Sequence, residues 1–172
     1  MSLRRAALAA QQLLDTHGVR TAPVDVEGLV AELGVQVVRK PMEDAISGLL
    51  LIRGDQAVIG VNKSHHPHRQ RFSIAHELGH YLLHRDAGDL FVDSSLTFYR
   101  DQRSSDGVFE QEIEANAFAA ALLMPEDLLR SYIAEEQLDL HDEQAAARLA
   151  SNFGVSGQAL AIRLARLNLI PA

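Results

Sequence analysis

The 172-residue sequence contains no cysteine and no tryptophan. The lack of cysteine excludes disulfides, cysteine nucleophiles and thiolate metal sites, and it fits a reducing compartment, so we expect a cytoplasmic protein. No run approaches the ~18 apolar residues that a membrane-spanning helix needs. Basic residues are also in deficit: the net charge of −7 does not favour binding to nucleic acid or to an anionic membrane.

Hydrophobic residues make up 47% of the chain, which is enough for a packed core in one domain, with or without a small appendage. Helix caps, turn residues and apolar periodicity predict the order of the elements. We expect helices over residues 3–15, 25–33, 67–84, 109–124, 126–136, 142–153 and 156–168. We expect strands over residues 35–39, 47–53 and 56–61, the last two joined by a Gly54-Asp55 hairpin turn.

The segment His76-Glu77-Leu78-Gly79-His80 is an H-E-x-x-H motif. Histidines four residues apart lie on one face of an α-helix, about 5–6 Å apart at Cβ. Two imidazoles in this arrangement bind one Zn²⁺, and Glu77 projects from the neighbouring edge towards a water on the metal. We therefore predict that His76 and His80 are metal ligands and that Glu77 is the general base.

Chance explains this motif poorly. With 8 histidines in the chain, the motif is expected only about 0.02 times. Its helix is also predicted to be largely buried, because apolar residues surround the motif: Phe72, Ile74, Ala75, Leu78, Leu82 and Leu83. Burying two histidines and a glutamate without partners costs free energy, and a metal removes that cost.

A catalytic zinc usually has three protein ligands and one open position. The predicted helix 109–124 offers Glu110, Glu112 and Glu114, and its later part is apolar on every side. Glu114 continues the stripe of Phe118 and Leu122 and is expected to point inward. Glu112 lies nearly opposite, and Glu110 sits at the exposed end, where a first-turn glutamate needs no metal. We therefore predict Glu114 as the third ligand.

The run from Phe72 to His84, FSIAHELGHYLLH, and the run from Glu114 to Pro125, EANAFAAALLMP, together resemble the ImmA/IrrE family of metallopeptidases. The resemblance covers residues 20–168. It implies an α+β fold: a minimal zincin-like domain over residues 1–125, with the H-E-x-x-H helix packed on a small mixed sheet. Separately from the resemblance, we expect a C-terminal helical, helix-turn-helix-like segment over residues 126–172 to pack on this domain. The resemblance also implies that Glu114 completes the metal site.

The family resemblance implies a function as well. It is that of a zinc-dependent endopeptidase whose protein substrate is a helix-turn-helix, XRE-like transcriptional repressor, so that cleavage derepresses stress-response or mobile-element genes. Mn²⁺ and Fe²⁺ accept similar nitrogen and oxygen ligands, so the sequence does not choose among these metals. The spacing from His80 to Glu114 is long because of residues 85–108, an excursion with one β-prone patch at 96–99. This excursion either shapes the substrate groove or is disordered.

Hydrolysis of this kind usually needs a second group that stabilises the oxyanion. Its candidates are Tyr99, His84, His65, His66 and His68. His84 equally fits a cation at a helix C-terminus, and the three loop histidines equally fit solvated polar residues. Asn116 either supports a metal ligand from behind or is a buried amide that the backbone satisfies.

Residues 147–167 have a helix-turn-helix pattern, with Gly154 in the turn and Ser156 as N-cap. Its predicted core is Leu149, Phe153, Val155, Leu160 and Leu164. The pattern raises an alternative of another class: a DNA-binding regulator, or one that sequesters a repressor without proteolysis. Residues 125–172 hold four arginines against seven acidic residues, so direct DNA binding is not expected. A helical bundle that braces the catalytic core or docks the repressor is favoured.

Overall fold

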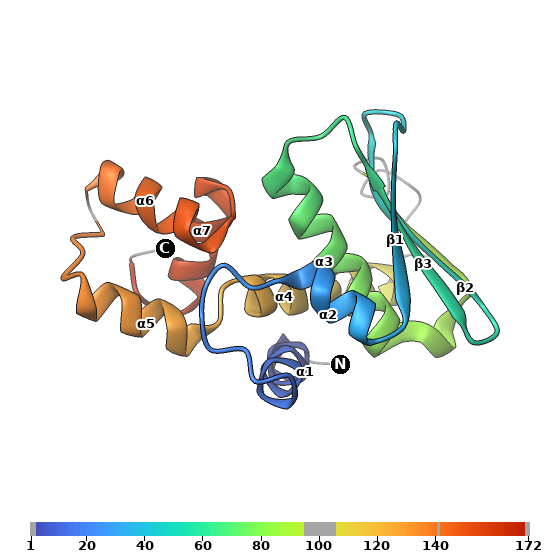
Figure 1. Ribbon diagram of the computed structural model, residues 1–172, viewed down its shortest axis with the longest axis horizontal. Helices are drawn as coiled ribbons and strands as arrows, with labels where there is room; N and C mark the ends of the chain where they lie inside the picture. The colour runs from blue at the N-terminus through green and yellow to red at the C-terminus, as the bar shows by residue number, and fades with distance from the viewer. Residues whose placement is uncertain (1–2, 95–105, 141, 171–172) are drawn as a thin grey trace.

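The computed structural model describes residues 3–94, 106–140 and 142–170, which form an α+β fold, as predicted. In chain order the elements are α1 (Leu3–Thr16), α2 (Val26–Glu32), β1 (Val35–Lys40), β2 (Ile46–Arg53), β3 (Gln56–Asn62), α3 (Pro67–His84), the 3₁₀ turn η1 (Arg85–Ala87), β4 (Leu90–Ser94), α4 (Asp106–Leu123), α5 (Glu126–Glu135), α6 (Glu143–Phe153) and α7 (Gly157–Arg166). Figure 1 shows the sheet at one end of the molecule, α5 to α7 at the other, and α1, α3 and α4 between them.

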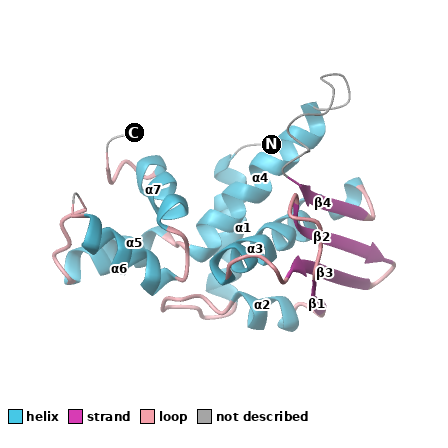
Figure 2. Cartoon of the chain, turned by 90° about the horizontal axis from the view of Figure 1, so that it is seen from above, coloured by secondary structure: helices cyan, strands magenta, loops and turns pink. Residues whose placement is uncertain are grey.

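The sheet is small and mixed, with the strand order β1-β3-β2-β4. Strand β1 runs parallel to β3, whereas β2 is antiparallel to both β3 and β4. The predicted β2–β3 hairpin is confirmed, and Gly54 adopts φ +57° in its turn, where a glycine pays no steric cost. Helix α3 packs against β2 and β3, and Figure 2 shows α2 beside β1 at the edge opposite β4.

Helices α3 and α4 form the centre of the core and run antiparallel. Residue His76 on α3 contacts Asn116 on α4, and His80 one turn later contacts Glu112 one turn earlier. The close approach depends on Gly79, because a Cβ there would lie 3.2 Å from the Cα of Ala115. Helix α1 packs on the same α4, so α4 is covered on several sides.

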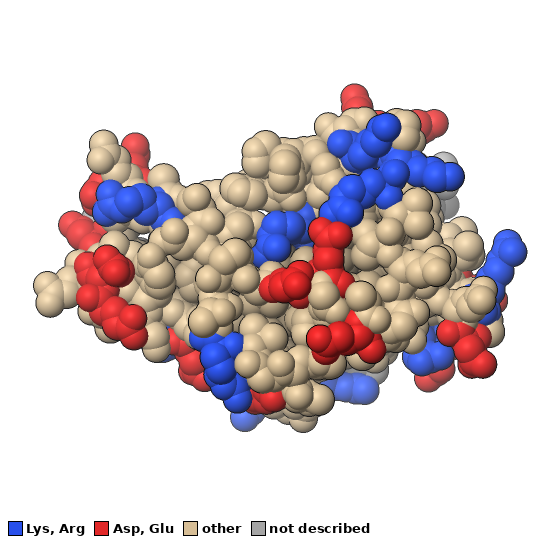
Figure 3. Space-filling view, viewed as in Figure 1, with Lys and Arg blue, Asp and Glu red and all other residues tan. Residues whose placement is uncertain are grey.

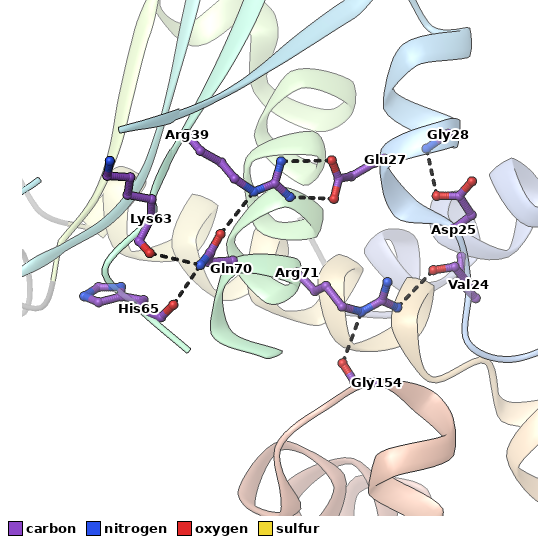
Figure 4. Close-up of polar contacts among 10 residues, drawn as sticks. All are labelled: Val24, Asp25, Glu27, Gly28, Arg39, Lys63, His65, Gln70, Arg71 and Gly154. Carbon is purple, nitrogen blue, oxygen red and sulfur yellow. Dashed lines mark hydrogen bonds and ion pairs between the residues drawn. The ribbon is translucent and has the colours of Figure 1, made fainter. Parts of the chain in front are cut away.

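The C-terminal helices are tied to this core by two arginines (Figure 4 shows the first). The Arg71 guanidinium on α3 donates to the carbonyl of Gly154 at 3.1 Å and to the carbonyl of Val24 at 2.9 Å. Arg163 on α7 donates to the carbonyl of Met124 at 3.1 Å, just beyond the end of α4. Helices α5 to α7 are thereby held against the helices that carry the candidate site.

The helix pair α6–α7 has the predicted local features. Gly154 adopts φ +64° after α6, and the Ser156 hydroxyl accepts a hydrogen bond from the backbone of Ala159. The five residues of the predicted core are all buried: Leu149, Phe153, Val155, Leu160 and Leu164. The helix-turn-helix character of this segment, and the division of the chain at residue 125, stay predictions.

The excursion over residues 85–108 holds a strand that the sequence did not place. Strand β4 pairs with β2 and completes the sheet. The β-prone patch at 96–99 lies outside the described residues. Within the described part of the chain, no helix is both long and apolar enough to cross a bilayer.

Candidate metal centre

Helix α3 delivers the H-E-x-x-H side chains into the core. It begins at Pro67, which suits a first-turn position, and the His66 ring caps it by accepting from the backbone of His68. His76, Glu77 and His80 are 1%, 0% and 1% exposed. Three ionisable side chains are therefore withdrawn from water on one helix, as the motif predicted, and each needs a partner.

The partner of the two histidines is Glu112. The Nε2 atoms of His76 and His80 lie 3.1 Å apart. One Glu112 oxygen is 3.2 Å from the His76 Nε2, and the other is 3.2 Å from the His80 Nε2. His76, His80 and Glu112 thus form a cluster, the metal cluster, whose ligand-type atoms converge on one point.

In this geometry Glu112, and not the predicted Glu114, meets the histidine pair. Glu114, which the sequence analysis selected, does not reach the histidine pair; its carboxylate contacts the Nε2 of His84 at 2.9 Å. It is buried as expected, but a buried carboxylate needs a partner and not necessarily a metal. The helix position was misjudged because α4 is buried on more than one face, so its apolar stripe does not mark the face that meets α3.

The charges around the cluster favour a cation at its centre. Burial alone would lower the pKa of His76, but the hydrogen bond to Glu112 and the charge of Glu77 outweigh burial and raise it to about 9. Burial alone would raise the pKa of Glu112, yet its hydrogen bonds to His76 and His80 lower it to about 2. Burial lowers the pKa of His80, so the cluster stabilises one positive charge, centred on His76 and balanced by Glu112.

A divalent metal fits this cluster. Ligand atoms about 2.0–2.1 Å from a tetrahedral zinc are ~3.3 Å from one another, close to the 3.1 and 3.2 Å separations here. The second nitrogen of His76 is also engaged, because its Nδ1 lies 3.1 Å from the Asn116 side-chain oxygen. This contact holds the His76 ring and directs its Nε2 towards the cluster. Two imidazoles and a carboxylate are the donor set of many catalytic zinc sites.

Glu77 lies beside the cluster, against β2. Gly48 makes room for it, since a Cβ at that position would be 3.2 Å from the Glu77 Oε1. Burial raises the pKa of Glu77 and the charge of His76 opposes this rise, but the carboxylates of Asp93 and Glu112 add to it, and the pKa reaches about 8. Both oxygens are buried and make no hydrogen bond of good geometry among the described residues. The backbone of Asp93 on β4 lies near this carboxylate and lowers its pKa slightly, against the larger effect of burial.

Strand β4 covers the cluster, a feature that sequence reasoning missed. The Phe91 ring stacks on the His80 imidazole, with centroids 4.8 Å apart and planes 23° apart. Asp93 brings its carboxylate close to His76 and Glu77. No motif in the chain signals these two residues, because only the pairing of β4 with β2 places them over α3.

The other residues considered from sequence take varied places. His84 is buried against His80 and Glu114 and is no exposed helix-end cation. His65 lies 3.2 Å from the carbonyl of Asp44, away from the cluster. Tyr99 lies outside the described residues.

A cavity of about 620 Å³ continues the seam between α3 and α4 beyond the cluster. Its lining includes Phe72, one turn before His76, and Ala120, one turn after Asn116. Asn116 lines the cavity and touches His76, so the two places are contiguous. The remaining lining comes from the end of α4, from histidine and arginine side chains near the start of α3, and largely from α7 and the turn before it: Met124, His66, His68, Arg69, Val155, Ser156, Gln158, Ala159, Ile162 and Arg166.

Comparison with known proteins places this arrangement in a family. The peptidase M78 family, described as the IrrE N-terminal-like domain, matches residues 30–165. The chain is 37% identical over 106 residues to the radiation response metalloprotease IrrE of Deinococcus radiodurans, covering 60% of this chain and 25% of the relative. It is 38% identical over 106 residues to the protein of the same name from Deinococcus deserti, covering 60% and 29%. The chain thus spans little more than a quarter of these relatives.

A solved structure shares the fold. The Mycobacterium tuberculosis transcriptional regulator matches with a TM-score of 0.63 at 24% identity, covering 94% of this chain and 47% of the other. At this identity the likeness concerns the fold alone. The family match spans most of the chain, includes the H-E-x-x-H helix and agrees with the resemblance carried by the two motifs. The chain therefore belongs to the ImmA/IrrE family of metallopeptidases.

Proposed function

We propose that this protein is a zinc-dependent endopeptidase. The observation that carries the proposal is the convergence of His76, His80 and Glu112, with the buried carboxylate of Glu77 beside them. The curated relatives are named metalloproteases, which agrees with this chemistry. Because this chain spans only part of their length, the substrates and partners of these relatives are not assigned to it.

The proposed ligands are His76, His80 and Glu112, with Asn116 holding the His76 ring. A bound divalent cation supplies Lewis acidity, which polarises a carbonyl and makes water more acidic. The cluster uses nitrogen and oxygen donors only, so Zn²⁺ is the first expectation, and Mn²⁺ and Fe²⁺ are the competitors to test.

Glu77 does the proton transfer in this proposal. Its carboxylate takes a proton from the attacking water and returns it to the leaving amine. Gly48 on β2 leaves the space that this carboxylate occupies. Asp93 adds negative charge next to it, which disfavours loss of the proton that Glu77 has accepted.

The substrate is proposed to lie in the cavity along α3 and α4. The cavity is contiguous with His76 through Asn116 and has an apolar floor for a bulky side chain. A peptide there passes between α7 and the start of α3. A helix-turn-helix repressor, the substrate class that the sequence resemblance implies, remains the proposed partner and sets the reaction in the cytoplasm.

The test uses the zinc-loaded protein and the helix-turn-helix repressor encoded beside it. Glu77→Gln is expected to keep zinc and to slow cleavage at least ~100-fold, because the general base is lost. His76→Ala is expected to lose both. Mass spectrometry of the products separates cleavage from mere sequestration of the repressor. Cleavage by Glu77→Gln at the wild-type rate contradicts the proposed mechanism.

A further inference from the structure

The cavity beside the metal cluster has an apolar interior and a basic rim. Met124 and Val155 are buried in its lining, and Phe72 on α3 is half-buried. Two exposed arginines line it from different helices, Arg69 from the start of α3 and Arg166 from the end of α7. Among the described residues, none of the side chains that line the cavity is acidic. Positive charge therefore gathers here in a chain whose net charge is −7.

The charges of both rim arginines are available to a ligand. Within the part of the chain that the structure describes, the arginines paired with carboxylates are others: Arg20, Arg39 and Arg130. Arg69 donates to the Ser47 hydroxyl at 2.7 Å, and this neutral acceptor leaves the charge of the guanidinium uncompensated. Burial lowers the pKa of His68 beside them, so the two arginines carry the positive charge of the rim at neutral pH.

The place of these residues on α3 gives a register relative to the metal cluster. Phe72 comes four residues before His76, and Arg69 comes seven residues before it. At 1.5 Å per residue these offsets are about 6 and about 10 Å along the helix. An extended peptide rises ~3.3 Å per residue. A side chain that reaches Phe72 therefore belongs to a residue about two positions from the bond at the metal, and one that reaches Arg69 about three positions from it.

We propose that the cavity selects a substrate segment with a bulky apolar side chain and, next to it on the side away from the cleaved bond, an acidic residue. The inference rests on the endopeptidase function proposed above and names the chemical class of its substrate. The apolar side chain packs against Phe72, Met124 and Val155. The carboxylate pairs with Arg69 and Arg166, whose planar guanidinium groups bind a carboxylate through two parallel hydrogen bonds.

Duplex DNA is the other polyanion that arginines bind, and the cavity suits it poorly. A cavity of about 620 Å³ with an apolar interior has the size and lining of a site for a few side chains. Binding of a duplex instead rests on several phosphate contacts, and an apolar interior offers none. An acidic peptide segment uses both the interior and the rim.

Binding of two short peptides to zinc-loaded Glu77→Gln tests this inference without cleavage. Each is a blocked, fluorescein-labelled alanine–glycine peptide with one leucine, flanked on both sides by glutamate in the first and by glutamine in the second. Fluorescence anisotropy should show about 5–10-fold tighter binding of the glutamate peptide, as two partly exposed ion pairs allow. The net charge of −7 predicts the reverse order, so the sign of the difference is informative.

Arg166 is the better arginine to substitute, because Arg69 also holds Ser47 on β2. In the Glu77→Gln background, Arg166→Gln is expected to reduce the preference for glutamate to about 2-fold or less. Arg166→Glu is expected to prefer a third peptide, with lysine at the flanking positions. Arg53→Gln removes the same charge at an exposed site outside the cavity and should keep the original preference. Unchanged zinc affinity in the Arg166 variants shows that the metal cluster is intact.

The inference and the proposed endopeptidase fail separately. A glutamate preference that is lost in Arg166→Gln, in a protein whose wild type cleaves no repressor, contradicts the peptidase and establishes the selectivity of the cavity. Equal affinity for the first two peptides, a preference unchanged in Arg166→Gln, or no binding at ~1 mM peptide overturns the inference, whatever the wild type cleaves. A DNA duplex that displaces the glutamate peptide, and does so less well in Arg166→Gln, assigns this arginine to phosphate and also overturns it.

Discussion

Glu112 and Glu114 stand two residues apart on α4 and so point about 200° apart around its axis. They meet His80 through different nitrogens, Glu112 at Nε2 directly and Glu114 through His84 at Nδ1. Substitution of these two glutamates should therefore have different effects on zinc binding. Glu112→Gln is expected to weaken zinc binding by more than ~100-fold, beyond the cost of an outer partner, whereas Glu114→Gln stays close to wild type. Isothermal titration with zinc measures both, and equal losses would refute the assignment.

The choice between these two glutamates could not be made from the sequence. Residues that follow them on α4 are buried on nearly every side: Ala115, Ala117, Phe118, Ala119, Ala121 and Leu122. A helix that is buried on all sides has no polar face in its sequence pattern, so the pattern does not show which of its faces meets α3. By contrast, His76 and His80 were recognisable, because a spacing of four residues places them on one face of a helix, and Glu77 follows His76 at the edge of that face.

At the scale of the element, the α3–α4 contact is the feature on which the site depends. A glycine inside a helix costs ~1 kcal/mol relative to alanine, and Gly79 lies in α3 next to His80, one of the proposed ligands. The space explains this glycine: a Cβ would meet the Cα of Ala115 and the ring of Phe118, each at 3.2 Å. Any larger residue must push α4, and with it Glu112, away from the histidines.

Gly79→Ala tests this dependence. Overpacking costs about 1–3 kcal/mol and the gain in helix propensity offsets ~1 kcal/mol of it, so we expect the melting temperature to fall by up to about 8 °C and zinc affinity to fall with it. Gly107→Ala is the matched control, because Gly107 also lies in a helix but its added Cβ meets nothing within 4 Å. An unchanged zinc affinity in Gly79→Ala would show that the helix spacing does not set the ligand geometry.

Elements with strong local signals were predictable, and those made by tertiary pairing were not. Helix α3 has the predicted bounds, and Asp25 caps α2 as predicted by accepting from the backbone of Gly28. Strand β4 is short and lies in a region without alternating apolar residues. Its strand conformation comes from pairing with β2, so no local pattern signals it.

At the scale of the whole molecule, the distribution of charge over the C-terminal helices argues against the alternative function, a DNA-binding regulator. Figure 3 shows acidic side chains gathered at the end formed by α5 and α6. On α7, Arg163 is bonded to the carbonyl of Met124 and Arg166 lines the cavity. We therefore expect no gel shift of duplex DNA at about 150 mM salt, where binding requires several phosphate contacts. A specific shift at this salt would favour the regulator.

Helix α7 and the turn before it instead form one wall of the cavity, and Arg71 is one of the two arginines that hold the C-terminal helices in place. Its two hydrogen bonds to the carbonyls of Val24 and Gly154 join segments far apart in the chain (Figure 4). Arg71→Met keeps an unbranched side chain and removes both donors. Hydrogen bonds from charged groups contribute roughly 1.5–3 kcal/mol each, so stability should fall clearly and amide exchange in α6 and α7 should accelerate.

Zinc affinity should barely change in Arg71→Met, because the proposed ligands lie on α3 and α4 and not on the helices that loosen. Cleavage of a protein substrate should fall, since one wall of its cavity is no longer fixed. Arg53→Met, at an exposed site at the end of β2, controls for the loss of one positive charge. Arg71→Met with wild-type exchange in α6 and α7 would mean that other contacts dock these helices. Wild-type cleavage together with faster exchange would mean that the substrate binds without α7.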